Sequence, residues 1–149
     1  MAGAAPDAPQ EFSTSSGVET ERAGAAVAAH LAPGDVVLVS GELGAGKTTF
    51  VRGALRVLGV RDAVTSPTFV VGHLYEGTRG PLAHLDLYRL TELEDEDPGL
   101  LDPYFGPETI SFVEWPERAH GSDLVLTTTV AVTLEHAGSD ARRILVDWT

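Results

Sequence analysis

The chain has 149 residues, a length that suits one domain with an adequate core. Its 22 acidic and 10 basic residues give a formal net charge of −12, which argues against extensive direct contact with nucleic acid, because phosphate backbones are bound by lysine and arginine. There is no cysteine for a disulfide or a thiolate zinc site, and no run of about 18 apolar residues that could span a membrane. We therefore expect a soluble cytoplasmic protein.

The first eleven residues are rich in Ala, Pro and Gly and are predicted to be disordered, with the domain extending over residues 12–149. They lack the basic region and the long apolar stretch of a signal peptide. Ser16-Gly17-Val18-Glu19 then matches a capping box and predicts a helix that continues to about Leu31.

An apolar run, a glycine-rich loop and a helical pattern follow in this order. Val36–Val39 is continuous and β-branched in type, which is typical of a strand buried on both faces. Residues 41–48, which we call the glycine loop, read G-E-L-G-A-G-K-T and match the phosphate-binding P-loop pattern G-x-x-x-x-G-K-T. Helical spacing of apolar residues and a stop signal at Gly59 predict a helix from Lys47 to Leu58. This order predicts a nucleotide-binding loop; the alternative is a glycine-rich turn that binds nothing.

Lys47 is the only lysine of the chain, and the other nine basic residues are arginines. In a loop of this type, glycines allow backbone N–H groups to converge on phosphate oxygens, and the lysine brings a point charge to the β- and γ-phosphates. The hydroxyl of Thr48 is suited to ligate the accompanying Mg²⁺. Because the protein is acidic, an anionic ligand also needs the local help of backbone dipoles and of the metal.

A loop at residues 65–68 lies 17 to 20 residues after Thr48, where GTPase-like proteins place hydroxyls that sense the γ-phosphate. Ser66-Pro67 also fits an ordinary turn. A strand is predicted to begin at Phe69–Val71, followed by a turn near Gly77 and a second strand over Leu82–Leu87.

The stretch from 90 to 106 is acidic and interrupted by prolines, so loops and a short helix are expected there. Its densest acidic cluster, within residues 92–97, fits a solvated loop better than a docking surface. Ile110–Val113 is a further candidate for a buried strand. Val130–Leu134 and Ile144–Trp148 flank a turn and predict a β-hairpin. The predicted fold is a single α/β, P-loop NTPase-like domain with a central mixed sheet and a C-terminal antiparallel β-hairpin.

Two carboxylates follow apolar strands, Asp86 and Glu114. In open α/β sheets, ligands gather beyond the carboxyl ends of the strands, so both carboxylates are candidates to hold or orient a metal; the alternative is a surface carboxylate at a strand exit. His84 alternates with Asp86, but a lone strand histidine is more often hydrogen-bonded locally than bound to a transition metal. Trp115 suits core packing or a stacking platform, and core packing is the default.

Four segments, in this order, resemble the TsaE (YjeE) family: GELGAGKTTF at 41–50, SPTF at 66–69, HLDLYRL at 84–90 and VEWP at 113–116. The resemblance covers roughly residues 13–148. It implies a bacterial ATPase that binds and hydrolyses Mg-ATP to support the TsaB–TsaD complex in threonylcarbamoylation of adenosine 37 of tRNAs that read ANN codons. In that reading TsaD performs the transfer, and the tRNA is met only through the complex.

The resemblance also implies roles for single residues. Lys47, Asp86 and Glu114 are expected to be catalytic, with Thr48, Glu114 and Asp86 holding or supporting Mg²⁺. The adenosine is expected near the stretch before the first helix and near Arg142. The remaining nucleotide contacts are expected from the loop amides, the sensing loop and the adjacent tryptophan: Gly41, Glu42, Leu43, Gly44, Ala45, Gly46, Lys47, Thr48, Thr49, Ser66, Thr68 and Trp115.

Other functions stay open at this point. A small P-loop kinase acting on a metabolite needs a substrate pocket and usually an arginine-bearing lid, for which the chain has little room. A GTP-dependent switch needs the N-K-x-D pattern, which is absent. A regulatory module that binds ATP without hydrolysis is a variant of the family reading. The acidic stretch Glu94–Pro98 departs from the family pattern, so partner docking there is less supported than nucleotide binding.

Overall fold

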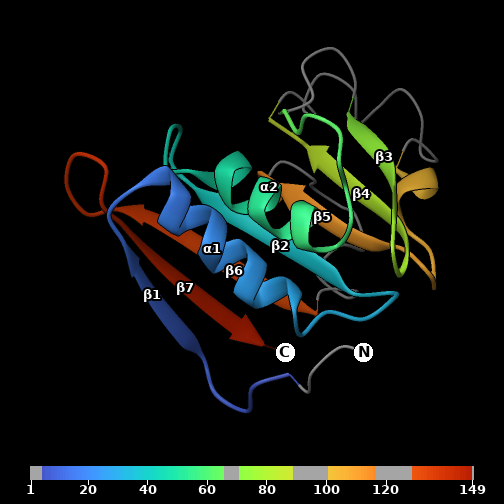
Figure 1. The fold of residues 1–149 in the computed structure, drawn as a ribbon, viewed down its shortest axis with the longest axis horizontal. Coiled ribbons are helices and arrows are strands. Elements are labelled where there is room, and N and C mark those ends of the chain that lie inside the picture. The colour runs from blue at the N-terminus through green and yellow to red at the C-terminus, as the bar shows by residue number, and fades with distance from the viewer. Residues whose placement is uncertain (1–4, 66–70, 89–100, 117–128, 149) are drawn as a thin grey trace.

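The computed structural model describes residues 5–65, 71–88, 101–116 and 129–148 (Figure 1). Their helices and strands are β1 (Gln10–Thr14), α1 (Gly17–Ala28), β2 (Val36–Gly41), α2 (Lys47–Val57), β3 (Gly72–Gly77), β4 (Gly80–Asp86), a 3-10 helix (Asp102–Tyr104), β5 (Ile110–Glu114), β6 (Val130–His136) and β7 (Arg142–Trp148). None of the helices in these ranges is long and apolar enough to cross a membrane.

The strands form one seven-stranded sheet in the order β1-β7-β6-β2-β5-β4-β3. β6, β2, β5 and β4 run parallel to one another, whereas β3–β4, β6–β7 and β1–β7 pair antiparallel. The predicted mixed sheet and C-terminal hairpin are therefore confirmed. Because β2, β4 and β5 run in the same direction, their carboxyl ends meet at one edge of the sheet, and the register of β4 and β5 pairs Asp86 with Glu114.

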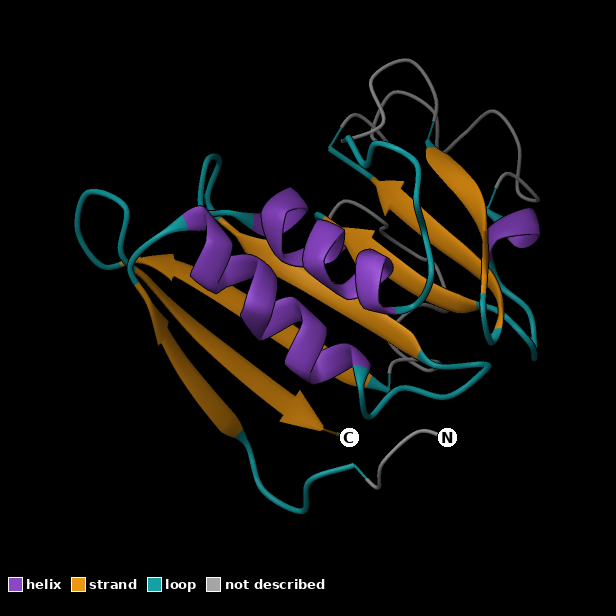
Figure 2. Ribbon diagram, in the orientation of Figure 1, coloured by secondary structure: helices purple, strands orange, loops and turns teal. Residues whose placement is uncertain are grey.

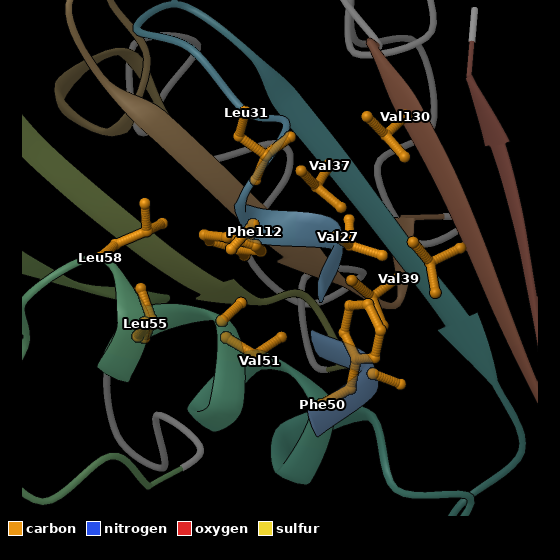
Figure 3. Packing of buried hydrophobic residues seen from close by; sticks show 14 of the residues in the cluster. Val27, Leu31, Val37, Val39, Phe50, Val51, Leu55, Leu58, Phe112 and Val130 are labelled. Atoms are coloured by element: carbon orange, nitrogen blue, oxygen red, sulfur yellow. The ribbon is translucent and has the colours of Figure 1, made fainter. Parts of the chain in front are cut away.

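Both long helices cover the same face of the sheet (Figure 2). Successive side chains of a strand point to opposite faces, so β2 contributes Val37 and Val39 to the core beneath the helices and Val36 and Leu38 to a smaller core on the other face. Figure 3 shows the larger core, in which residues of both helices meet the sheet: Val27, Leu31, Phe50, Val51, Leu55, Leu58, Val37, Val39, Phe112 and Val130. Burial on both faces explains the continuous apolar run of β2.

Helix α1 begins where its sequence predicts. Ser16 is the N-cap, and its hydroxyl accepts a hydrogen bond from the Glu19 N–H at 3.2 Å. The Glu19 carboxylate reaches one residue further back than expected: it accepts from the Ser15 backbone N–H at 2.8 Å and from the Ser15 hydroxyl at 3.0 Å. Both hydrogen bonds lower the pKa of the Glu19 carboxyl group, and the bond from the Ser15 backbone N–H has the larger effect.

The end of α1 lies at Ala28, three residues before the predicted Leu31. The next turns close with tighter i to i−3 bonds, from His30 N to Val27 O and from Leu31 N to Ala28 O, both about one turn ahead of Pro33. A proline disfavours helical backbone in the residue before it, so Pro33 prevents the helix from continuing through Ala32. Leu31 is nevertheless fully buried.

The N-terminal boundary predicted at residue 12 is wrong for Gln10 and Glu11, which belong to strand β1. β1 pairs antiparallel with β7 at the edge of the sheet. Its exposure alternates, so that Phe12 packs against the core and Thr14 is buried. The unpaired backbone N–H and C=O groups at the edge of β7 form hydrogen bonds with this polar segment, which explains why it becomes a strand.

Other boundaries differ by one to three residues. β3 begins at Gly72, and positions 69 and 70 of the strand predicted from Phe69 lie outside the described residues. β4 ends at Asp86, one residue before the predicted end. α2 ends at Val57, and Gly59 has a φ of 106°, in agreement with its role as stop signal. The acidic cluster within 92–97 lies outside the described residues, whereas the short helix expected before Gly106 is the 3-10 helix at Asp102–Tyr104.

Helices α1 and α2 approach each other through two glycines. A Cβ placed on Gly24 of α1 would lie 2.0 Å from the Phe50 carbonyl oxygen, and one on Gly53 of α2 would lie 2.0 Å from the Glu21 carbonyl oxygen. The backbone of each helix therefore occupies the space that a methyl group on the other would need, and any larger residue must push the helices apart.

We expect Gly53→Ala to destabilise the protein by about 3 kcal/mol, the scale of a severe overpacking change. For a chain of this size this corresponds to a fall in the thermal midpoint of roughly 6 to 12 °C. Calorimetric melting of the purified variant measures it. Gly17→Ala is the matched control, because a Cβ on Gly17 meets only Thr49 Cγ2 at 3.9 Å. Equal melting of the two variants would contradict the close helix contact.

Candidate functional site

The glycine loop joins the carboxyl end of β2 to the N-terminus of α2. Gly46 is the N-cap of α2 with a φ of 98°, and it provides no side-chain cap hydrogen bond. Gly41 has a φ of 156°, and a Cβ there would lie 2.6 Å from the Leu134 carbonyl oxygen. The loop is tightened by a bond from Ala45 N to Glu42 O at 3.0 Å. The first N–H groups of a helix have no partner within the helix, so this uncapped end presents backbone donors and the positive end of the helix dipole.

Lys47 is buried, with 5% of its surface exposed. Its Nζ donates to Gly41 O at 2.6 Å and to Glu42 O at 2.9 Å, and it lies 4.0 Å from the centroid of the Trp115 ring. Burying a cation is costly unless its charge is compensated. Two charge-assisted hydrogen bonds and a ring face compensate it here. The ammonium group of the chain's single lysine is therefore fixed beside the first two residues of the glycine loop.

Glu114, at the end of β5, is 2% exposed and is held from two sides. The Thr48 hydroxyl lies 3.0 Å from each of its carboxylate oxygens, and His84 Nε2 lies 2.5 Å from Glu114 Oε2. Side chains two residues apart on a strand point to the same face of the sheet. Glu114 lies two residues after Phe112, and His84 lies two residues after Leu82. Phe112 and Leu82 pack beneath the helices, so Glu114 and His84 also face the helix side of the sheet. The result is a fixed carboxylate directly beside a hydroxyl of the first turn of α2.

His84 is completely buried. Since a carboxylate only accepts hydrogen bonds, the short contact assigns a proton to Nε2 of His84. Nδ1 has no hydrogen-bond partner within the described residues. The prediction of a local hydrogen bond for this histidine is confirmed. In the described part of the chain, His, Asp and Glu side chains do not form a group of three or more that could hold a metal ion.

Asp86 and Trp115 complete this edge of the sheet. Asp86 is half-buried, directly opposite Glu114 in the register, and its Oδ1 accepts from the Tyr88 N–H at 3.0 Å. Trp115 turns the chain after β5 with a φ of 58°. Its ring packs against the smaller core and lies edge-on to Tyr88, with centroids 4.9 Å apart. Trp115 therefore packs against the core, as expected by default, and also contacts Lys47, while its role as a stacking platform stays a prediction.

The sequence model of the family described as "Threonylcarbamoyl adenosine biosynthesis protein TsaE" matches residues 14–144. The chain belongs to the TsaE family. The tRNA threonylcarbamoyladenosine biosynthesis protein TsaE of Bacillus subtilis is 38% identical over 126 residues, which cover 85% of this chain and 77% of that protein. The protein of the same name from Streptomyces coelicolor is 50% identical over 93 residues, 58% of this chain and 60% of its own length.

A solved structure agrees with this assignment. The crystal structure of Bacillus subtilis YdiB superposes with a TM-score of 0.72 at 31% identity and covers 93% of this chain and 84% of that one. Both the family resemblance and the predicted fold class are thereby confirmed.

In this TsaE-family chain, most of the predicted site residues meet at one edge of the sheet. Lys47, Thr48, Asp86, Glu114 and Trp115 lie there through the contacts described above. The remaining predicted loop positions form the glycine loop and the first turn of α2: Gly41, Glu42, Leu43, Gly44, Ala45, Gly46 and Thr49. Ser66 and Thr68 lie outside the described residues, so their sensing role stays a prediction.

Arg142, predicted near the adenosine, lies at the start of β7, and its guanidinium is directed at the glycine loop. Nε donates to Ala45 O and Nη2 to Gly44 O, both at 3.1 Å. Tyr88 and His136 are neighbours of the site that the sequence reading of the TsaE-family chain missed. Tyr88 could have been found from its position two residues after Asp86. His136 offers no such signal in the sequence, because it comes near the glycine loop through the pairing of β6 with β2.

Proposed function

We propose that this chain binds and hydrolyses Mg-ATP in the service of tRNA threonylcarbamoyladenosine biosynthesis. One observation carries the proposal: the Thr48 hydroxyl, directly after Lys47 at the start of α2, lies 3.0 Å from both oxygens of the buried Glu114. A hydroxyl and a carboxylate are hard oxygen ligands of the kind that Mg²⁺ prefers, and an uncapped helix N-terminus suits phosphate.

The residues present fit the nucleotide and the metal. The N–H groups of the glycine loop and of the first turn of α2 would hold the phosphates, with Lys47 contributing its charge to the β- and γ-phosphate oxygens. Thr48 and Glu114 would hold Mg²⁺, with water and phosphate oxygens as its other ligands. The bound metal supplies charge neutralisation on those oxygens.

Several side chains of the protein each have a different role in hydrolysis. Lys47 stabilises the charge on the transferring phosphoryl group, and it is well suited to do so because it is buried and its effect is not screened by water. Asp86 is the carboxylate at the sheet edge that orients the attacking water or the metal's water ligands. Hydroxyls of Ser66 and Thr68 sense the γ-phosphate, and His84 fixes the Glu114 carboxylate through its hydrogen bond.

We further propose that hydrolysis is slow in the isolated protein and serves the TsaB–TsaD complex in the cytoplasm. Membership of the TsaE family supports this role. Leu43, at the tip of the glycine loop, is 74% exposed and Tyr88 is 41% exposed, so apolar contacts for a protein partner are available beside the site. The net charge of −12 favours contact with tRNA through the complex rather than directly.

The rate of ATP hydrolysis by the purified protein is expected to rise when TsaB and TsaD are added together. The measurement is phosphate release at saturating Mg-ATP, with TsaB or TsaD alone as controls for contaminating activity. A rate that stays unchanged in the presence of both proteins would contradict the partner role. Transfer of phosphate to a small metabolite instead of water would favour the alternative of a small P-loop kinase.

A further inference from the structure

Arg142 connects the C-terminal hairpin to the glycine loop. It is the first residue of β7, directly after the turn between β6 and β7, and it is half-buried. Its guanidinium donates to four backbone carbonyls: Nε to Ala45 O at 3.1 Å, Nη2 to Gly44 O at 3.1 Å, and Nη1 to Ala141 O at 2.8 Å and Ser139 O at 3.2 Å. Two of these carbonyls belong to the glycine loop and two to the hairpin turn.

Two further contacts join the same parts of the chain. β6 pairs with β2 up to Gly41, where the Leu134 carbonyl leaves no room for a side chain on the glycine. On the exposed side, His136 Nε2 lies 3.4 Å from the Leu43 carbonyl oxygen. The hairpin therefore contacts the loop at its first residue, at its tip and just before α2.

The carbonyl bonds have a consequence for the N–H groups on the other side of each peptide. A peptide unit is planar and trans, so its C=O and N–H point in opposite directions. Holding the Ala45 carbonyl at Arg142 directs the Gly46 N–H away from the hairpin, and holding the Gly44 carbonyl directs the Ala45 N–H toward its bond with Glu42 O. A permanent cation on two loop carbonyls also reduces the negative potential that they present to an anion.

We propose that Arg142 is a positioning residue that holds the glycine loop in its phosphate-accepting conformation before the nucleotide binds. It does so from the hairpin and without contact to the adenosine. A guanidinium is required, because only its planar set of donors reaches four carbonyls at once; an ammonium is a single point charge. The inference rests on the proposed function in that the anion is Mg-ATP.

The first test needs no nucleotide. Arg142→Gln is expected to raise hydrogen exchange of the Ala45 amide, which donates to Glu42 O, by about tenfold in the free protein, the effect of losing one to two net hydrogen bonds. Arg143→Gln is the matched control, because the next residue pairs with Glu11 and Glu135 and does not contact the loop. Equal exchange of the loop in the wild type and in Arg142→Gln would overturn the proposal.

The second test separates the loop from the nucleoside. Arg142→Gln is expected to weaken the binding of Mg-ATP and of Mg-tripolyphosphate by the same factor, about tenfold. Arg142→Lys should remain weakened, and millimolar guanidinium, compared with equal NaCl, should restore part of the affinity of Arg142→Gln. KM should rise more than kcat falls. Loss of affinity for ATP alone would assign Arg142 to the adenosine and overturn the positioning role.

Failure of the proposed function can be distinguished from failure of the positioning role of Arg142. A wild-type protein that binds neither Mg-ATP nor tripolyphosphate would overturn the proposed function, while the exchange measurement on the free protein would still decide the role of Arg142. If Arg142→Gln does not fold, Arg142→Lys keeps the positive charge on a single donor nitrogen and takes its place in both measurements. Unchanged exchange and affinity in that variant would equally overturn the proposal.

Discussion

Lys47→Ala is expected to lower the rate of ATP hydrolysis by roughly 10³-fold, the scale of removing a charged group that acts on the transferring phosphoryl oxygens. Lys47 is the only lysine of the chain and is held in place, buried, by two loop carbonyls and the Trp115 ring. No other side chain with an ammonium can replace it. The measurement is the steady-state rate over a range of Mg-ATP concentrations, with and without TsaB and TsaD.

Arg56→Ala is the matched control for this variant. It removes one positive charge from the exposed last turn of the same helix and leaves the loop intact. Its hydrolysis rate should equal that of the wild type. Undiminished hydrolysis in Lys47→Ala would exclude the glycine loop as the phosphate site, whereas a loss in both variants would indicate an effect of net charge alone.

Glu114→Gln is expected to raise the Mg²⁺ concentration needed for half-maximal hydrolysis by at least about tenfold and to lower the maximal rate about 100-fold, because it removes the anionic ligand but keeps its shape. Glutamine retains an oxygen that can accept from His84 or Thr48, so the fold should be preserved. Titration of the hydrolysis rate with Mg²⁺ at fixed ATP measures the effect. Glu108→Gln, an exposed acidic residue just before β5, is the control.

Glu114→Ala separates the metal role from a structural one. Alanine leaves both His84 Nε2–H and the Thr48 hydroxyl without their acceptor in a buried position, so this variant should also melt at a lower temperature than Glu114→Gln. A normal Mg²⁺ titration in Glu114→Gln, combined with a large loss of stability in Glu114→Ala, would make Glu114 a structural residue only.

The parts of the fold that could be predicted from the sequence are those determined locally. The β2–loop–α2 unit follows from an apolar run, glycines at fixed spacing and a helical pattern, all within about 25 residues. The meeting of Asp86 and Glu114 followed from a general property of parallel strands, whose carboxyl ends share one edge. Both predictions required only that each segment be recognised as a helix, strand or loop, and not which strand pairs with which.

The features that were missed depend on partners far away in the sequence. β1 is a short, mostly polar segment that becomes a strand only because β7 offers it an edge, with Gln10 paired to Val146. The two glycine-loop carbonyls bound by Arg142 are 97 and 98 residues away along the chain. Nothing in the residues around Arg142 distinguishes a guanidinium that contacts adenosine from one that binds the glycine loop, so its contacts could not be predicted.

The pairing of β1 with β7 matters for anyone who shortens this protein. A fragment trimmed to the family-matched residues 14–144 would lose nearly all of β1 and the last four residues of β7. The remaining stub of β7 would present unpaired N–H and C=O groups to solvent, and open strand edges of this kind recruit strands from other molecules. The eight strand residues that such a fragment would lose, four of β1 and four of β7, therefore keep β7 paired on both sides, and the safe limits for a fragment lie outside the region that sequence comparison recognises.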